Sequence, residues 1–303
     1  MQFSGAADAV RDPRELCLAP PVFPFAWAVD WGQDRYGLWQ SFACKGVRQQ
    51  LRWLPPDLFL MGSPADELER FDRELQHLVV LTKGFWLADT ACTQGLWQAV
   101  TGKNPSSFTG DDQLPVDSVN WHDGMEFIAR INSLIPGLDL RLPTEAQWEY
   151  ACRAGTSTPF SFGPYISTAQ VNFKGNYHYY VWPQGQYREK TVAVKFLPCN
   201  NWGLYEMHGN LWEWCSDWLG DYQDVIVDDP QGPAQGGDEI YEIIKKLQLE
   251  IVDDPQGPAQ GVLRVLRGGS WLDDGRFVRS AFRGGDGPGH SYHNIGLRLS
   301  RGQ

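Results

Sequence analysis

Two stretches near the carboxyl end of the chain alternate apolar residues with arginine. They are Val265-Leu-Arg-Gly-Gly-Ser-Trp271 and Ile295-Gly-Leu-Arg-Leu-Ser300, and this alternation is typical of strands half-buried against a core. The residues between them, Leu272 to Asn294, are polar and rich in glycine, and few of them could contribute to a core. The pattern therefore predicts a fixed scaffold that carries an exposed, irregular surface.

The middle of the chain predicts three helices. Thr93 can cap a helix that runs through Val100 and ends at Gly102. Residues 121–134 place apolar side chains at helical spacing, and residues 144–147, Thr-Glu-Ala-Gln, form a capping box that opens the third helix.

Short strands are predicted at residues 58–63 and 78–81. Residues 156–201 have little helical period and are predicted to form long loops held by aromatic side chains. Residues 1–51 form a lead-in with several prolines and many aromatic residues. We expect this lead-in to be an extension packed on a main domain of residues 52–303.

Residues 226–236 recur letter for letter as residues 251–261. Two copies are too few for a repeat architecture, so the repeat indicates a duplicated loop, natural or engineered, inserted in the domain as residues 225–262. Between the copies, apolar residues from Ile240 to Leu247 share one face of an expected helix. This helix either covers a local apolar patch or binds a partner.

Composition narrows the classes of function. The formal net charge of −11 argues against a phosphate-binding surface, so nucleic acid is not an expected partner. No apolar run reaches membrane-spanning length and no signal peptide is evident, so the expected location is the cytoplasm, with no membrane partner. The six cysteines are dispersed, which favours buried thiols over disulfides or a zinc site. Nothing in the sequence indicates an oligomeric state.

Five motifs occur in order along the chain. They are Phe59-Leu-Met-Gly-Ser63, Leu114-Pro-Val-Asp-Ser-Val-Asn-Trp121, Arg141-Leu-Pro-Thr-Glu-Ala-Gln-Trp-Glu-Tyr-Ala151, Gly203-Leu-Tyr-Glu-Met-His-Gly-Asn-Leu-Trp-Glu-Trp214 and Arg267-Gly-Gly-Ser-Trp271. Together they resemble the family of the formylglycine-generating enzyme, or sulfatase-modifying factor. The resemblance implies an α+β, C-type lectin fold that is irregular and loop-rich, with short antiparallel sheets and two to three helices. It implies less about activity, because function lies in sites grafted on a fold.

The enzymatic branches of this family depend on metal ligands that this chain does not carry in the same places. The oxidases hold copper with a cysteine pair in the C-terminal segment, whereas residues 271–303 contain no cysteine. Soft Cu(I) needs thiolate, which Asp273, Asp274 or Ser280 cannot replace. Cys199 and Cys215 lie elsewhere, and Cys215 is expected to be a buried structural thiol. No redox metal is therefore expected.

The second enzymatic branch, the non-heme-iron sulfoxide synthases, uses closely spaced histidines on a separate helical domain, and no such arrangement precedes the lectin-like part. His290 and His293, with Asp286 nearby, could form a metal triad. In a glycine-rich loop they are more often solvated side chains.

The C-terminal segment is most similar to the variable proteins of diversity-generating retroelements. In these proteins a reverse transcriptase makes errors at template adenines, and randomised Asn codons never yield Lys, Glu, Gln, Met or Trp. Residues 272–294 contain none of the five, although they make up roughly a fifth of ordinary sequence. The resemblance predicts the following variable, ligand-binding residues: Leu272, Asp273, Asp274, Phe277, Phe282, Gly284, Gly285, Asp286, Gly287, Gly289, His290, Ser291, Tyr292, His293 and Asn294.

Such a surface requires side chains that point outward from a backbone fixed by other residues. Tyr292, Phe277 and Phe282 would be rigid aromatic contacts, and Ser291, Asn294 and the histidines would be adaptable hydrogen-bonding groups, a mixture that antigen-binding loops also use. The expected fixed frame consists of Arg267, Gly268, Gly269, Ser270, Arg279, Ser280, Arg283, Pro288, Gly296 and Arg298. The alternative is a plain glycine-rich loop on an inactive relative of the enzymes.

The resemblance also implies a structural calcium site. It assigns the carboxylates of Glu206 and Glu213 and the carbonyls of Gly209 and Leu211 as ligands, and such oxygen donors suit a hard cation. The alternative is that Glu213 accepts hydrogen bonds with no ion present. A further ion near Asn172 and Phe173 is a weaker prediction.

These observations favour a non-catalytic protein whose variable C-terminal surface binds a protein or another macromolecule. One alternative is a metal-dependent oxidase, with copper or non-heme iron, that modifies a protein or thiol substrate. A second is an adaptor that works through the Ile240–Leu247 helix.

Overall fold

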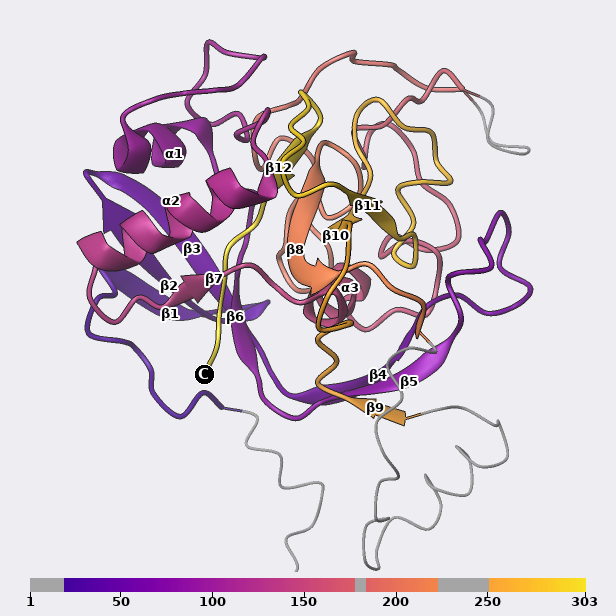
Figure 1. Cartoon of the computed structure of the whole chain (residues 1–303), viewed down its shortest axis with the longest axis horizontal. Helices are drawn as coiled ribbons and strands as arrows, with labels where there is room; N and C mark the ends of the chain where they lie inside the picture. Colours follow the sequence, from indigo (N-terminus) through magenta and orange to yellow (C-terminus); the bar gives the residue numbers. More distant parts are fainter. Residues whose placement is uncertain (1–18, 178–183, 223–250) are drawn as a thin grey trace, which may run out of the picture.

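The computed structural model describes residues 19–177, 184–222 and 251–303. In this part of the chain three helices and three sheets are arranged around two large apolar clusters and a smaller third one (Figure 1). The helix expected at Ile240–Leu247 and the first copy of the duplicated loop lie outside the described residues. In the described part no helix is both long and apolar enough to cross a bilayer.

Each helix begins where a side chain caps its free amides. The Thr93 hydroxyl accepts from the Leu96 amide at the start of α1 (Gln94–Thr101), and Gly102, in the left-handed conformation, ends it. Asn120 and Asp123 form a capping box at the start of α2 (Trp121–Leu134). The capping box predicted at Thr144 opens α3 (Glu145–Arg153). All three helix predictions are confirmed.

The largest sheet joins the two ends of the described chain. Its order is β1 (Asp30–Asp34), β2 (Gly37–Cys44), β3 (Val47–Leu54), β6 (Phe85–Ala88), β13 (Ser300–Arg301) and β7 (Leu140–Arg141). Residues 30–44 thus share a sheet with residues of the main domain, and β3 runs across the expected boundary at residue 51. Because β13 lies between β6 and β7, the carboxyl end of the chain is fixed in the sheet.

The second sheet carries most of the C-terminal segment. Its order is β11 (Gly284–Asp286), β10 (Arg264–Arg267), β8 (Trp212–Trp218) and β12 (Ile295–Leu297), with β12 parallel to β8. The third sheet consists of β4 (Asp57–Met61), β5 (His77–Leu81) and β9 (Ile251–Asp253). The strands predicted at 58–63 and 78–81 correspond to β4 and β5, and β9 opens the second copy of the duplicated loop.

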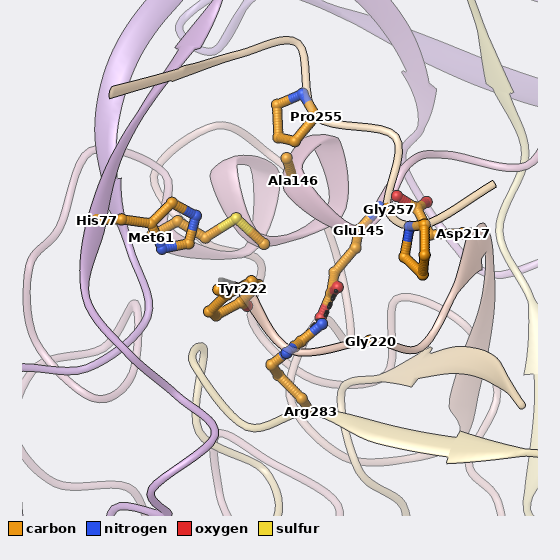
Figure 2. A pocket seen from close by; sticks show the side chains of 11 residues that line it. Met61, His77, Glu145, Ala146, Asp217, Gly220, Tyr222, Pro255, Gly257 and Arg283 are labelled. Atoms are coloured by element: carbon orange, nitrogen blue, oxygen red, sulfur yellow. Dashed lines mark hydrogen bonds and ion pairs between the residues drawn. The ribbon is translucent and has the colours of Figure 1, made fainter. Parts of the chain in front are cut away.

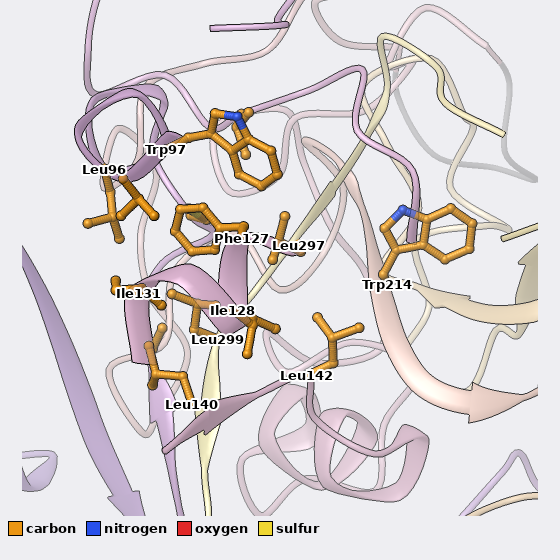
Figure 3. Packing of buried hydrophobic residues seen from close by; sticks show 14 of the residues in the cluster. Leu96, Trp97, Phe127, Ile128, Ile131, Leu140, Leu142, Trp214, Leu297 and Leu299 are labelled. Carbon is orange, nitrogen blue, oxygen red and sulfur yellow. The ribbon is translucent and has the colours of Figure 1, made fainter. Parts of the chain in front are cut away.

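The larger apolar cluster lies between α1, α2 and the first two sheets (Figure 3). The rings of Trp97 and Phe127 stack with centroids 4.7 Å apart. Leu297 and Leu299 from the end of the chain are fully buried in the same cluster. Burial of these leucine side chains in the cluster therefore holds the segment that follows residue 294.

Candidate ligand-binding surface

The C-terminal segment alternates between strands and two loops. Strands β10, β11, β12 and β13 form its framework, and the loops span residues 268–283 and 287–294. In Figure 1 both loops lie on the side of the molecule away from the carboxyl terminus. The contacts below show which parts of these loops are fixed and which are exposed.

Buried arginines fix the first loop. Both ends of the Arg279 guanidinium are paired, with Glu67 at 2.6 Å and Glu74 at 2.7 Å, and all three side chains are buried. Arg283 makes a two-pronged pair with Glu145, with nitrogen–oxygen distances of 2.6 and 2.7 Å. Charged hydrogen bonds of this geometry are strong and directional, so they set the path of the backbone between residues 279 and 283.

Arg267 fixes the same loop by donating hydrogen bonds to the loop's backbone carbonyl groups. Its guanidinium donates to the carbonyl oxygens of Ser280 at 2.8 Å and Ala281 at 3.1 Å, and it pairs with Glu149 of α3. Gly268 and Gly269 follow in left-handed conformations, and a Cβ atom on Gly269 would lie 2.6 Å from the Phe277 carbonyl oxygen. Only glycine allows this close turn. The expected frame residues of this loop are therefore buried and engaged.

A small cavity of about 20 Å³ lies against the Arg283–Glu145 pair (Figure 2). Asp217 faces it, and burial, together with the nearby Glu145 carboxylate, raises the pKa of Asp217 to about 7. The cavity is large enough for about one water molecule, so it is not a ligand pocket.

The second loop is exposed on a fixed backbone. The Tyr292 carbonyl oxygen accepts from the amides of Ser118 at 3.1 Å and Ile295 at 3.0 Å, and the Pro288 carbonyl accepts from Trp121 at 3.1 Å. The Tyr292 side chain is nevertheless 48% exposed. Side chains in this loop can therefore differ without removing the bonds that hold the loop.

Trp271 connects the two loops. Its ring lies 5.4 Å from that of His293, 5.5 Å from Phe108 and 6.2 Å from Tyr187, measured between centroids. Phe108 and Tyr187 come from distant parts of the chain and were not among the predicted site residues. No local sequence signal distinguishes them from the other aromatic residues.

The predicted variable residues fall into three groups by exposure. The exposed ones are Leu272, Gly289, His290, Ser291, Tyr292 and His293. The half-buried ones are Asp273, Phe277, Gly284, Gly285, Asp286, Gly287 and Asn294. The buried ones are Asp274 and Phe282.

The expectation that all of these side chains face outward is wrong for Phe282 and Asp274. The Phe282 ring packs against Phe71 and Phe277, with centroids 5.1 and 5.0 Å away. The Asp274 carboxylate is turned inward and held by Arg276, with nitrogen–oxygen distances of 3.0 and 2.8 Å. Aromatic packing and a local ion pair thus outweigh exposure at these two positions.

Two of the half-buried glycines have little room for a side chain. On β11, a Cβ atom at Gly284 would lie 2.9 Å from the Trp212 ring, and one at Gly285 would lie 2.7 Å from Leu219. A larger residue at either position therefore requires Trp212 or Leu219 to move. At Gly289, in contrast, a Cβ atom would meet no atom within 4 Å.

The structure does not assemble a metal triad from the histidines. His290 bonds to Asp286 at 2.6 Å, whereas His293 packs beside Trp271 and Phe108. Over residues 19–177, 184–222 and 251–303, no three His, Cys, Asp or Glu side chains gather closely enough to hold a metal ion.

The two carboxylates assigned to calcium accept hydrogen bonds from protein groups. Both Glu213 carboxylate oxygens accept from Arg298, at 2.8 to 3.1 Å, and one also accepts from the Trp148 indole at 2.7 Å. Glu206 accepts from the Lys195 amide instead, and burial raises its pKa to about 7. A cation at Glu213 would have to lie beside a buried guanidinium, which is electrostatically unfavourable.

The remaining predicted ion and thiol positions are buried. The Asn172 amide nitrogen donates to Asn210 and to the Lys190 carbonyl, whereas its side-chain oxygen has no hydrogen-bond partner among the described residues. The ion near Asn172 and Phe173 therefore stays a prediction. Cys215 is fully buried, which raises the pKa of its thiol, and it is a structural residue as expected. The cysteines that the structure describes are all free thiols.

Comparisons with known proteins agree with this architecture. The model of the "Sulfatase-modifying factor enzyme 1-like domain" family matches residues 43–303. The formylglycine-generating enzyme of Streptomyces coelicolor is 29% identical over 257 residues, which cover 77% of this chain and 70% of that enzyme. The serine/threonine-protein kinase pkn1 of Chlamydia caviae is 32% identical over 193 residues, which cover 62% of this chain but only 24% of the kinase. The chain thus spans about a quarter of that relative's length.

Two solved structures share the fold. Treponema denticola variable protein 1 superposes with a TM-score of 0.68 at 25% identity, over 87% of this chain and 98% of that one. PvdO from Pseudomonas aeruginosa superposes with a TM-score of 0.67 at 24% identity, with the same coverage. These similarities confirm the predicted α+β, loop-rich fold. From the extent of the family match we conclude that this chain belongs to the family of the sulfatase-modifying factor enzyme 1-like domain.

Proposed function

We propose that the chain is a non-catalytic binding protein whose C-terminal segment, residues 265–303, presents a surface diversified by a retroelement. The observation that carries the proposal is that this segment combines exposed side chains with a backbone held by buried residues. Exposed side chains such as Leu272, Tyr292 and His293 stand on a backbone that Arg267, Arg279 and other buried groups hold. The similarity to the Treponema denticola variable protein supports it.

The inferred ligand is a protein or another macromolecule. The exposed groups combine an aromatic ring, small residues and hydrogen-bonding side chains, which is the mixture that suits broad protein surfaces. Phe108 and Tyr187, packed around Trp271, extend this surface beyond the C-terminal segment.

The alternative is a metal-dependent oxidase, since formylglycine-generating enzymes are relatives. Residues 271–303 contain no thiol to bind copper, and the described cysteines outside them are buried or, at Cys199, half-buried. Oxygen consumption by the full chain, supplied with copper(I) or iron(II) and a cysteine-containing peptide, would favour the oxidase. We expect none above the rate of the free metal.

A pair of displayed libraries tests the proposed surface. One randomises Leu272, His290, Ser291, Tyr292 and His293; its matched control randomises the same number of frame positions, namely Ser270, Ser280, Arg279, Arg283 and Arg267. The first library should retain folded display in most clones and yield binders to a probe protein such as biotinylated lysozyme. The control should lose display. Equal loss in the two libraries would contradict the proposal.

Flanking DNA gives an independent test of the diversification. We expect a near-copy of the stretch that codes for residues 265–303, differing from it at adenines and lying beside a reverse transcriptase gene. A genomic neighbourhood with no such copy would leave binding possible but would contradict diversification by a retroelement.

A further inference from the structure

The outer edge of β4 is open in the described part of the chain. The third sheet has the order β4-β5-β9, so β4 pairs with β5 on one side, and no described strand pairs with its other side. Open edges of this kind attract further strands, and proteins commonly block them with charged side chains or a covering loop. Here the side chains of Leu58 and Leu60 are 45% and 37% exposed instead.

The alternation of hydrogen-bonded and non-hydrogen-bonded pairs between β4 and β5 directs the backbone amides and carbonyls of these two leucines away from β5, towards the open edge. The Val80 carbonyl accepts from the Asp254 amide at 2.8 Å, on the β9 side of β5. Leu58, which lies opposite Val80, is therefore in a non-hydrogen-bonded pair. Consistent with this, the Leu58 amide donates to its neighbour Asp57 at 2.8 Å. By the same alternation, the amide and carbonyl of Leu60 point away from β5.

A groove of about 310 Å³ runs along this edge. Leu58 and Leu60 line one wall, and Tyr150, Trp202 and the loop after α3 line the other. α3 contacts β4 through Tyr150, whose ring lies 5.4 Å from that of Phe59, and at the following turn, where the Gly62 amide donates to Glu149 at 2.9 Å and Arg153 donates to the Gly62 carbonyl at 2.7 Å. The groove lies beside these contacts, along Leu58 and Leu60.

The groove continues into a second pocket of about 520 Å³ that shares Asp57, Tyr150 and Trp202 with it and that Tyr36 also lines. Arg153, the basic residue of the groove, is buried and paired with Glu149. Asp57 is exposed, and no lysine or arginine forms an ion pair with it among the described residues. The Tyr36 ring already carries the guanidiniums of Arg35 and Arg52, at 4.5 and 5.0 Å from its centroid, and Tyr150 is buried. The Asp57 carboxylate and the half-buried Trp202 ring are therefore the groups in this pocket that suit a further cation.

We propose that this groove binds an extended segment of a partner protein as an added strand on β4, with a lysine or arginine side chain of the segment placed in the aromatic pocket beside Asp57. Main-chain bonds to the Leu58 carbonyl and to the amide and carbonyl of Leu60 would supply the affinity common to added strands, and the pocket would supply selectivity. The chain's net charge of −11 also favours a basic partner. The site lies outside residues 265–303 and does not depend on the proposed function.

The probe is a fluorescent peptide of about seven residues, the length of an ordinary strand, with alternating valine and threonine and a central lysine. Fluorescence anisotropy with the full chain should show saturable binding. Exchanging the lysine for glutamate should weaken binding about tenfold. Methylating alternate backbone amides should abolish binding, because these amides donate to β4. Equal binding of the lysine and glutamate peptides, or retained binding of the methylated one, would overturn the proposal.

Variants locate the site. Asp57→Asn keeps the acceptor for the Leu58 amide and should remove the preference for lysine. Leu60→Lys should abolish binding, and the matched control Leu134→Lys, at a leucine that is 52% exposed on α2, should not. Two results would assign the groove to another occupant and so refute the proposal. One is self-association of the full chain that Leu60→Lys abolishes, which indicates a second copy. The other is peptide binding only after removal of residues 1–18, whose successor Ala19 lines the second pocket.

Discussion

Replacing Arg279 with methionine should destabilise the chain strongly. Methionine preserves much of the side-chain volume but leaves Glu67 and Glu74 buried without their cation. Removing one partner of a buried ion pair costs about 3–5 kcal/mol. At about 2–4 °C per kcal/mol for a chain of this size, the Tm should fall by about 6–20 °C.

The loss of stability in the Arg279→Met variant should be larger at high pH than at low pH. Burial already raises the pKa of Glu67 in the native protein, against the lowering effect of Arg279. Without Arg279 the pKa rises further, so the folded variant holds protons that the unfolded chain releases above about pH 4.5. Stability then falls as pH rises, and the Tm difference from the native chain should be smaller at pH 5 than at pH 8.

Thermal and denaturant unfolding of the full chain measure these effects. The control is the triple variant Arg279→Met, Glu67→Gln, Glu74→Gln, which removes the uncompensated charges and should recover at least half of the lost stability. A fall in Tm of less than about 3 °C for the single variant, or equal losses at the two pH values, would refute the assignment of this ion pair as a main fixing point of the loop.

Three further outcomes follow from the same structure. The variants Leu272→Ser and Tyr292→Ser should each change the free energy of unfolding by no more than about 0.5 kcal/mol, since both side chains are exposed on a fixed backbone; a larger loss in denaturant unfolding would contradict their exposure. Gly289→Tyr should be tolerated, whereas Gly296→Ala should cost more than about 1 kcal/mol, because its Cβ would lie 2.4 Å from the Val116 carbonyl oxygen; similar Tm values for the two would count against this packing. Burial raises the pKa of Asp217 to about 7, so the folded protein keeps the Asp217 proton and its free energy of unfolding should fall as pH rises from 4 to 7. Asp217→Asn should flatten this pH dependence in denaturant unfolding, and an unchanged slope would locate the titrating group elsewhere.

Local signals account for what the sequence predicts correctly. The caps at Thr93 and Thr144 act on amides within three residues, so their effect can be inferred without knowing the fold. The five ordered motifs identify the fold for a different reason, namely that they match a family model over residues 43–303. The capping box at Asn120 is equally local, and the prediction of that helix rested on apolar spacing alone.

What the sequence does not reveal depends on distant partners. Arg279 is expected to be part of a fixed frame, but its carboxylate partners lie more than two hundred residues earlier in the chain. Phe282 belongs to the set of residues that randomised codons allow, yet its direction depends on Phe71. A permitted residue type says nothing about which way a side chain points, and for that reason the two buried positions could not be separated from the exposed ones.

The arginines that hold the first loop have a consequence at the level of the gene. Arg279 and Arg283 lie within a few positions of residues that the proposed diversification would change. An error-prone copying step would therefore copy the codons of the fixed arginines together with those of the variable residues. Fixed arginines survive such copying only if any adenine in their codons lies at a synonymous position, which allows the CGN codons and excludes AGA and AGG. The pairing of a guanidinium with Glu67 and Glu74 would then be recorded as a choice among synonymous codons, readable in the nucleotide sequence alone.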